Sequence, residues 1–280
     1  MNYPSVLSLA GDTPLIPCPS FPFASPVLVK LEGANPTGSL KDRVIRHFLE
    51  YYDASGKTVV AADWGPFALS AAWGCQLYHI PCLCFVPSDI PPCILKLLHQ
   101  LDAIVEVHNR SLPELRKMVS ELSGQNPHQY VFLDPWSDGE NPMAYMETLA
   151  EELWQETNGS LSAIIAPADT CGCLMGCSTG LKIHDPEILA AAAVLEDKDF
   201  SYGTSDPEGP ADPELYVPQL TDCIFRCPLS EAQSYQELLW QQEGILCGPS
   251  GGAALWAAGH IKTEKEGSIA VILPSRFSFY

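Results

Sequence analysis

Two patterns of apolar residues alternate along most of this chain. Short apolar runs predict strands, while stretches with an apolar residue every three or four positions predict helices. The expected strands are 27–32, 58–62, 81–87, 103–108, 130–133, 163–168 and 268–273. The expected helices are 39–52, 67–77, 91–101, 111–123, 142–157, 230–242 and 250–260. This alternation predicts an α/β fold with mainly parallel, twisted sheets and helices on both faces, and Asp197–Pro218 is expected to be loop.

Length and charge narrow the class of protein. The 280 residues, 46% of them hydrophobic, allow one large α/β unit or two compact lobes. No apolar run approaches the roughly 20 residues of a membrane-spanning helix, and no secretory signal is evident, which predicts a soluble, cytoplasmic protein. The net charge of −19 disfavours nucleic acid as a partner.

The eleven cysteines do not form a metal-binding pattern. Cys171, Cys173 and Cys177 have the spacing C-x-C-x3-C, and Cys82 and Cys84 form C-x-C, but zinc sites normally show paired C-x2-C motifs. We therefore expect free, largely buried thiols and no metal site.

The segment Val27–Arg43 is the most informative. It predicts a strand, a tight Asn-Pro-Thr-Gly turn and a helix with Lys41 in its first turn. The positive end of the helix dipole disfavours an ammonium ion, which keeps a neutral amine available as a nucleophile. An isolated lysine would normally be an ordinary surface residue, so a chemical role for Lys41 is inferred from the whole segment.

With Gly11–Leu15 upstream, this segment closely resembles the start of cysteine synthases, cystathionine β-synthases and related fold-type II enzymes (tryptophan synthase β-like) that use pyridoxal phosphate (PLP). The resemblance implies that Lys41 links covalently to PLP and moves protons during catalysis. The stretch Glu243–Ala253 also resembles a family segment. Ser275, after the last strand, resembles the serine that hydrogen-bonds the pyridine nitrogen.

The resemblance also implies a phosphate-binding turn, which in the family reads Gly-Thr-Gly-Gly-Thr. The matching residues here are Asp169, Thr170, Cys171, Gly172 and Cys173, of which Thr170 and Gly172 keep the family residue. The last four are expected to hold the cofactor phosphate. Asp169 places a carboxylate beside an anion site, and Cys171 has less conformational freedom than glycine.

The loop that holds the substrate carboxylate in the family, Thr-Ser-Gly-Asn-Thr-Gly, is also changed. Asp63, Trp64 and Gly65 occupy its place and are the candidate substrate-binding residues. Its hydroxyls are missing, and a carboxylate here would repel a substrate carboxylate.

The resemblance implies two lobes, a smaller mobile one at 38–137 and a larger one formed by 1–37 and 138–280, and a homodimer. Two hypotheses remain open. The chain is either a PLP-dependent lyase or transferase adapted to another small-molecule substrate, as in specialised metabolism, or a degenerate relative with PLP-independent activity or a binding role. Lys41 and Ser275 favour the first hypothesis, and Trp64 and Asp169 the second.

Overall fold

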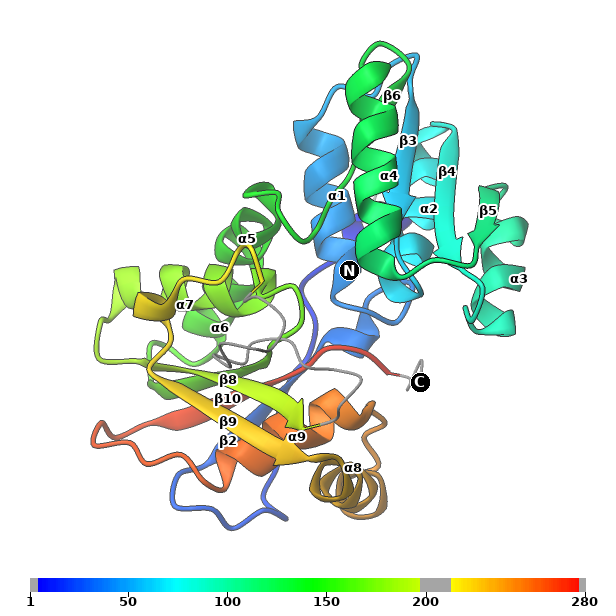
Figure 1. Ribbon diagram of the computed structural model, residues 1–280. Coiled ribbons are helices and arrows are strands. Elements are labelled where there is room, and N and C mark those ends of the chain that lie inside the picture. Colours follow the sequence, from blue (N-terminus) through cyan, green and yellow to red (C-terminus); the bar gives the residue numbers. More distant parts are fainter. Residues whose placement is uncertain (1–4, 197–212, 277–280) are drawn as a thin grey trace.

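The computed structural model describes residues 5–196 and 213–276, which form two sheets covered by helices (Figure 1). The six-stranded sheet has the order β1 (Leu15–Pro17), β2 (Val27–Leu31), β10 (Ser268–Leu273), β7 (Leu161–Pro167), β8 (Leu189–Glu196) and β9 (Cys223–Pro228). Its strands are parallel except for the β1–β2 pair. The four-stranded sheet is parallel throughout, in the order β5 (Ile104–His108), β4 (Cys82–Pro87), β3 (Thr58–Ala62) and β6 (Tyr130–Phe132).

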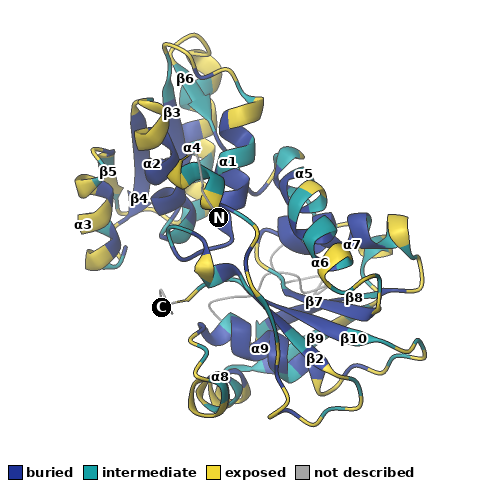
Figure 2. Cartoon of the chain, turned by 180° about the vertical axis from the view of Figure 1, so that it is seen from behind, coloured by how far each residue is buried: buried dark blue, intermediate teal, exposed yellow. Residues whose placement is uncertain are grey.

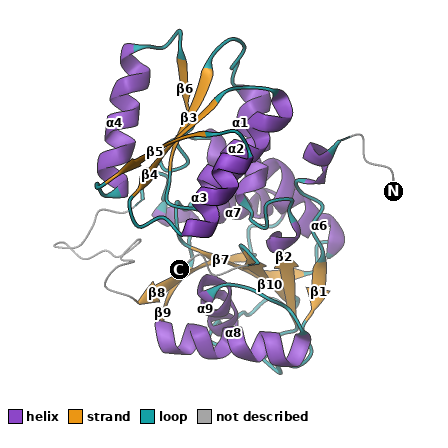
Figure 3. Cartoon of the chain, turned by 90° about the vertical axis from the view of Figure 1, so that its right-hand side faces the viewer, coloured by secondary structure: helices purple, strands orange, loops and turns teal. Residues whose placement is uncertain are grey.

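Helices cover both faces of each sheet (Figure 3). Around the four-stranded sheet, α4 (Leu112–Gln125) lies on one face and α2 (Pro66–Tyr78) and α3 (Pro92–Gln100) on the other, with α1 (Lys41–Tyr51) packed on α2. Around the larger sheet, α9 (Pro249–Ala258) and then α8 (Leu229–Glu243) lie on one side. The other side holds α5 (Glu140–Tyr145), a π-helical turn (Met146–Ala150), α6 (Glu151–Glu156) and α7 (Gly172–His184). Short 3-10 turns lie at Val6–Leu9, Glu32–Ala34 and Pro218–Leu220.

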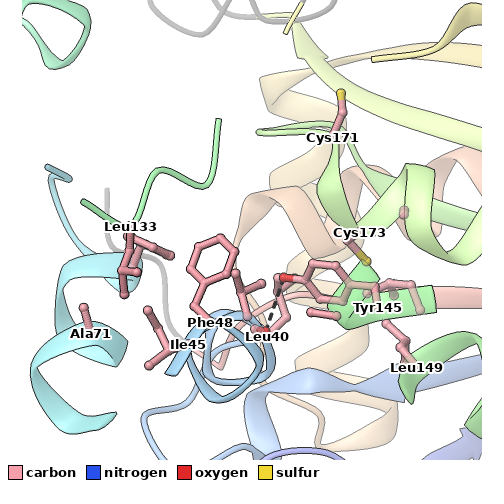
Figure 4. Close-up of a cluster of buried hydrophobic side chains, with 14 of the residues drawn as sticks. Leu40, Ile45, Phe48, Ala71, Leu133, Tyr145, Leu149, Cys171 and Cys173 are labelled. Atoms are coloured by element: carbon pink, nitrogen blue, oxygen red, sulfur yellow. Dashed lines mark hydrogen bonds between the residues drawn. The ribbon is translucent and has the colours of Figure 1, made fainter. Parts of the chain in front are cut away.

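Burial follows this layering. Figure 2 shows buried central strands and exposed outer faces on α3 and α8. The largest hydrophobic cluster joins side chains of α1 and α2 to those of α5 and α7. It therefore connects the helices of the four-stranded sheet with helices of the six-stranded sheet. In this cluster the hydroxyl of Tyr145 donates a hydrogen bond to the carbonyl of Leu40 at 3.3 Å (Figure 4). The residue just before Lys41 is therefore fixed from the side of the larger sheet.

A buried ionic network fixes the other side of α1. Arg43 donates to Glu32 at 2.7 Å and to Glu152 at 2.8 Å. Lys30, fully buried in β2, lies 2.9 Å from Glu152 and 2.7 Å from Glu156. Buried charges persist when they are paired in this way. The network ties the first turn of α1 to β2 and α6.

Most predicted elements are confirmed, and the strands 58–62 and 268–273 agree in both bounds. The single helix predicted at 142–157 is wrong in detail, because the π-helical turn interrupts it. Residues 197–212 of the predicted loop lie outside the described residues. The boundaries and mobility of the two lobes stay predictions.

Candidate active site

The carboxyl ends of parallel strands from both sheets border one cavity of about 700 Å³. Ligands of open α/β folds commonly bind at such strand ends. Eight of the residues singled out from the sequence line this cavity, namely Lys41, Asp63, Trp64, Asp169, Thr170, Cys171, Cys173 and Ser275. Gly65 and Gly172 adjoin them in the chain. Residues as far apart in sequence as Lys41 and Ser275 are thus brought together.

Lys41 is the first residue of α1, and its side chain is 11% exposed. Its Nζ lies 3.3 Å from Oδ2 of Asp169 and 3.5 Å from Oγ1 of Thr170. The amine therefore faces the turn after β7, where the sequence predicts the phosphate site. Asp169, whose side chain is 57% exposed, pairs with the lysine from the solvent side of the turn.

The neighbouring Asp42 fixes the start of α1. Its carboxylate accepts hydrogen bonds from the amide and hydroxyl of Thr37, at 2.7 and 2.6 Å, and from the hydroxyl of Ser70 at 2.6 Å. Burial raises the pKa of Asp42 to about 6, although these hydrogen bonds act in the opposite direction. The backbone amide of Leu40 also donates to the carbonyl of Pro274 at 2.9 Å. These bonds hold Lys41 in one position.

The turn before α7 has the geometry of an anion site. Cys171 adopts the left-handed φ of 63°, a conformation that glycine adopts without strain. The amide of Met175 makes the first hydrogen bond of the helix, to the carbonyl of Cys171 at 2.9 Å. The helix geometry itself provides no carbonyl for the amides of residues 172–174. A helix start with such amides and no acidic residue in its first turn suits a phosphate group.

Asn141, at the start of α5, supports this turn. Nothing in the sequence around it indicated such a role. Its Nδ2 donates to the carbonyl of Pro135 at 2.5 Å and to Oγ1 of Thr170 at 3.2 Å. A Cβ added to Gly172 would lie 2.3 Å from Oδ1 of Asn141, so glycine is required there. This Oδ1 is buried, and no donor among the described residues reaches it.

The start of α2 differs from the start of α7. Asp63 follows β3 directly and is 6% exposed. Its Oδ2 accepts hydrogen bonds from the amides of Gly65 and Phe67, both at 2.9 Å, and of Ala68 at 3.1 Å. Burial raises the pKa of Asp63, while the amides of Gly65 and Ala68 and the charge of Lys41 lower it. The first amides of this helix are therefore already occupied by a carboxylate of the chain.

Ser275 lies just beyond β10 and forms an isolated bridge with Ser39, two residues before Lys41. The amide of Arg276 donates to the carbonyl of Gly38 at 3.1 Å. The end of β10 is thereby attached to the turn that precedes the lysine.

Trp136 is a second cavity residue that the sequence did not indicate. It is 7% exposed, and the guanidinium of Arg116 lies 5.4 Å from its ring centroid. Arg116 also bonds Asp134 at 2.7 Å, so α4 holds the segment around Trp136 against the cavity. A tryptophan in a distant loop carries no local signal for such a role.

The described part of the chain contains neither a membrane-spanning helix nor a cluster of metal ligands. No helix there is long and apolar enough to cross a membrane. No group of three or more His, Cys, Asp or Glu side chains there could hold a metal ion. The expectation of no metal site stays a prediction.

Comparison with known proteins identifies the family. The model of the pyridoxal-phosphate dependent enzymes matches residues 6–275. This chain belongs to that family. It is therefore a PLP-dependent enzyme, which confirms the family predicted from the Lys41 segment.

Curated relatives agree with this assignment. Cysteine synthase B of Pseudomonas aeruginosa is 26% identical over 98% of this chain and 94% of its own length. Cystathionine beta-synthase of Apis mellifera is 25% identical over 99% of this chain, and the chain spans 60% of that longer protein. The cysteine synthase of Entamoeba histolytica, a solved structure, superposes with a TM-score of 0.89 at 21% identity, over 100% of this chain and 89% of its own. This likeness confirms the predicted fold class.

The residues at the cavity fit the family's cofactor. The start of α7 suits its phosphate, and Lys41 offers an amine within the same cavity. Asp169 does not occupy the helix start but pairs with Lys41.

Proposed function

We propose that this enzyme catalyses PLP-dependent β-elimination or β-replacement on an amino-acid-derived substrate, with a specificity that differs from that of cysteine synthases. The cysteine synthase and cystathionine β-synthase relatives support the reaction class. The central observation is that Lys41 lies within 3.5 Å of Thr170, in the turn that opens α7. The carboxylate of Asp63 at the start of α2 supports the altered specificity.

In this proposal each residue has a defined task. Thr170, Cys171, Gly172 and Cys173 hold the phosphate, chiefly through backbone amides, and Ser275 bonds the pyridine nitrogen. When bound, PLP supplies an electron sink for the carbanion left by loss of the substrate's α-proton. Lys41 would hold the cofactor, and its Nζ would accept the α-proton of the bound substrate. Trp64 and Trp136 exclude water from one side of the cavity.

The test is exchange of the substrate's α-hydrogen with deuterated solvent, followed by proton NMR over a panel of β-substituted amino acids and their amides. We expect the PLP-loaded enzyme to exchange at least one compound and Lys41→Ala to lose that exchange by at least about a thousandfold. Lys57→Ala, which removes an amine outside the cavity, serves as the control. Equal exchange by Lys41→Ala would contradict the proposal, and no exchange of any compound would favour the non-catalytic hypothesis, which the Lys41–Asp169 pair supports.

We further propose that the enzyme acts in the cytoplasm as a homodimer. None of its eleven cysteines, all of them among the described residues, forms a disulfide, and thiols stay reduced in that compartment. The dimer rests on the family resemblance. Sedimentation equilibrium should give twice the chain mass of 30.5 kDa, and a mass of one chain would contradict the dimer.

A further inference from the structure

Two helix starts border the active-site cavity, and they differ in whether a carboxylate of the chain accepts hydrogen bonds from their first amides. At α7 the first turn contains no acidic residue, and the N-cap residue Cys171 forms no side-chain capping hydrogen bond. At α2 the carboxylate of Asp63 takes the amides of Gly65, Phe67 and Ala68. The cavity thus has one helix start suited to an anion and one that the chain fills itself.

The filled helix start faces the reacting region. Asp63, Trp64, Pro66 and Phe67 line the same cavity as Lys41. The positive charge of Lys41 also acts on Asp63, because it lowers the pKa of that carboxyl group. A substrate amine near Lys41 would therefore place its neighbouring groups close to Asp63.

An anionic group at this position meets two obstacles. The amides that would bind it already have a buried acceptor, and a second carboxylate would be repelled by Asp63 and by Asp169, which lies 3.3 Å from Lys41. A neutral amide meets neither obstacle, because its N–H donates hydrogen bonds to a carboxylate. Its carbonyl also acidifies the adjacent C–H more than a carboxylate does, so loss of the α-proton does not require a free acid.

We propose that Asp63 is a specificity-determining residue that restricts the substrate to α-amino compounds whose carboxyl group is neutral, with an amide as the preferred form. This inference rests on the proposed function, since it assigns a substrate class to the same cavity. The buried carboxylate takes the place of a substrate carboxylate at the start of α2. Free amino acids are then excluded by charge and by the loss of their binding amides.

The test compares L-serine with L-serinamide, a pair that differs only in the group under discussion. Binding to the PLP-loaded enzyme is followed by visible absorbance, and binding with or without PLP is followed by the thermal unfolding midpoint. We expect the wild type to bind L-serinamide at least about tenfold more tightly than L-serine. Because the thermal measurement does not need the cofactor, the preference is tested even if PLP uptake, and with it the proposed function, fails.

Three variants separate the role of Asp63 from a general charge effect. Asp63→Ser and Asp63→Asn both retain a side-chain acceptor for the start of α2, which protects the fold. We expect each to reduce the preference for the amide by about tenfold or more. Asp89→Ser, which removes an exposed carboxylate from the same cavity, is the matched control and should retain the preference within about twofold.

The preference for the amide in the wild type and in the three variants decides whether Asp63 sets the substrate class. A preference for L-serinamide that falls in both Asp63 variants and persists in Asp89→Ser supports it. Equal or tighter binding of L-serine by the wild type, an unchanged preference in both Asp63 variants, or no binding of either compound overturns it. The absorbance of the ligand-free protein after addition of PLP reports separately on the proposed function.

Discussion

Oδ2 of Asp169 lies 3.3 Å from Nζ of Lys41, so the lysine expected to hold the cofactor has an anionic partner within its own cavity. The pairing also explains how an aspartate can begin the phosphate-binding turn. Its carboxylate is directed at the lysine, while α7 and its amides begin three residues later, at Gly172. Lys41 would have to give up this contact for its Nζ to hold the cofactor.

Removal of this partner should favour the cofactor. For Asp169→Asn we expect PLP to bind up to about fivefold more tightly, a modest gain because the Asp169 side chain is 57% exposed and such pairs are weak. Titration of PLP followed by absorbance measures the change, with Asp89→Asn as the control for net charge. Weaker PLP binding by Asp169→Asn would mean that the aspartate assists the cofactor.

Gly172 should not tolerate a side chain. In Gly172→Ala the new Cβ would lie 2.3 Å from Oδ1 of Asn141 and would disturb the bond from Asn141 to Thr170. We expect a loss of about 2 kcal/mol in the free energy of unfolding and PLP binding weaker by about tenfold. Urea denaturation and PLP titration measure the two effects.

Gly139→Ala is the matched control, because a Cβ at Gly139 meets no atom within 4 Å. It should change neither quantity appreciably. Normal PLP binding by Gly172→Ala would show that the turn before α7 does not hold the phosphate.

The buried network around Glu152 should give a distinct pH dependence of stability. Burial would raise the pKa of Glu152, but hydrogen bonds and charges from Arg43 and Lys30 lower it from 4.5 to about 2. A carboxylate with a lowered pKa stabilises the folded state above its unfolded pKa, and this contribution is lost as the pH falls through 4.5 toward 2. We expect Glu152→Gln to lose about 3 kcal/mol of unfolding free energy at pH 7.

That loss should shrink steadily as the pH is lowered from 4.5, and urea denaturation at several pH values measures it. Glu50→Gln, in an exposed pair with Arg46, should cost less than about 0.5 kcal/mol at any pH. A Glu152→Gln deficit that is independent of pH would assign the loss to packing and not to ionisation.

The sequence predicts the part of this site that depends on local motifs. Lys41 follows a turn and starts a helix, and Ser275 follows an apolar strand, so both could be placed on their elements in advance. Asn141 and Trp136 could not, because their contacts with Thr170 and Arg116 depend on how distant elements pack. The sequence also did not predict that Asp63 caps α2. The importance of that cap for the site depends on the cavity that α2 borders, which is a feature of the tertiary structure.

Two of the elements that the sequence did not predict have compositions that conflict with their structure. Leu189–Glu196 is rich in alanine, which is depleted in strands, yet it forms the buried strand β8. Gly172–His184 contains three glycines, which disfavour helix, yet it forms α7. Close packing explains this choice, because a Cβ on Gly176 would lie 2.2 Å from the carbonyl of Pro142. Tertiary contacts therefore override local propensity beside the site.

The most direct test of the account is covalent trapping of the cofactor. The purified enzyme would be incubated with PLP, reduced with borohydride and digested, and the modified peptide located by mass spectrometry. We predict a visible absorbance band before reduction and a single modification at Lys41, both absent from Lys41→Ala. A protein that stays colourless with excess PLP, or one modified at another lysine, would contradict the assignment of Lys41 as the cofactor-binding residue.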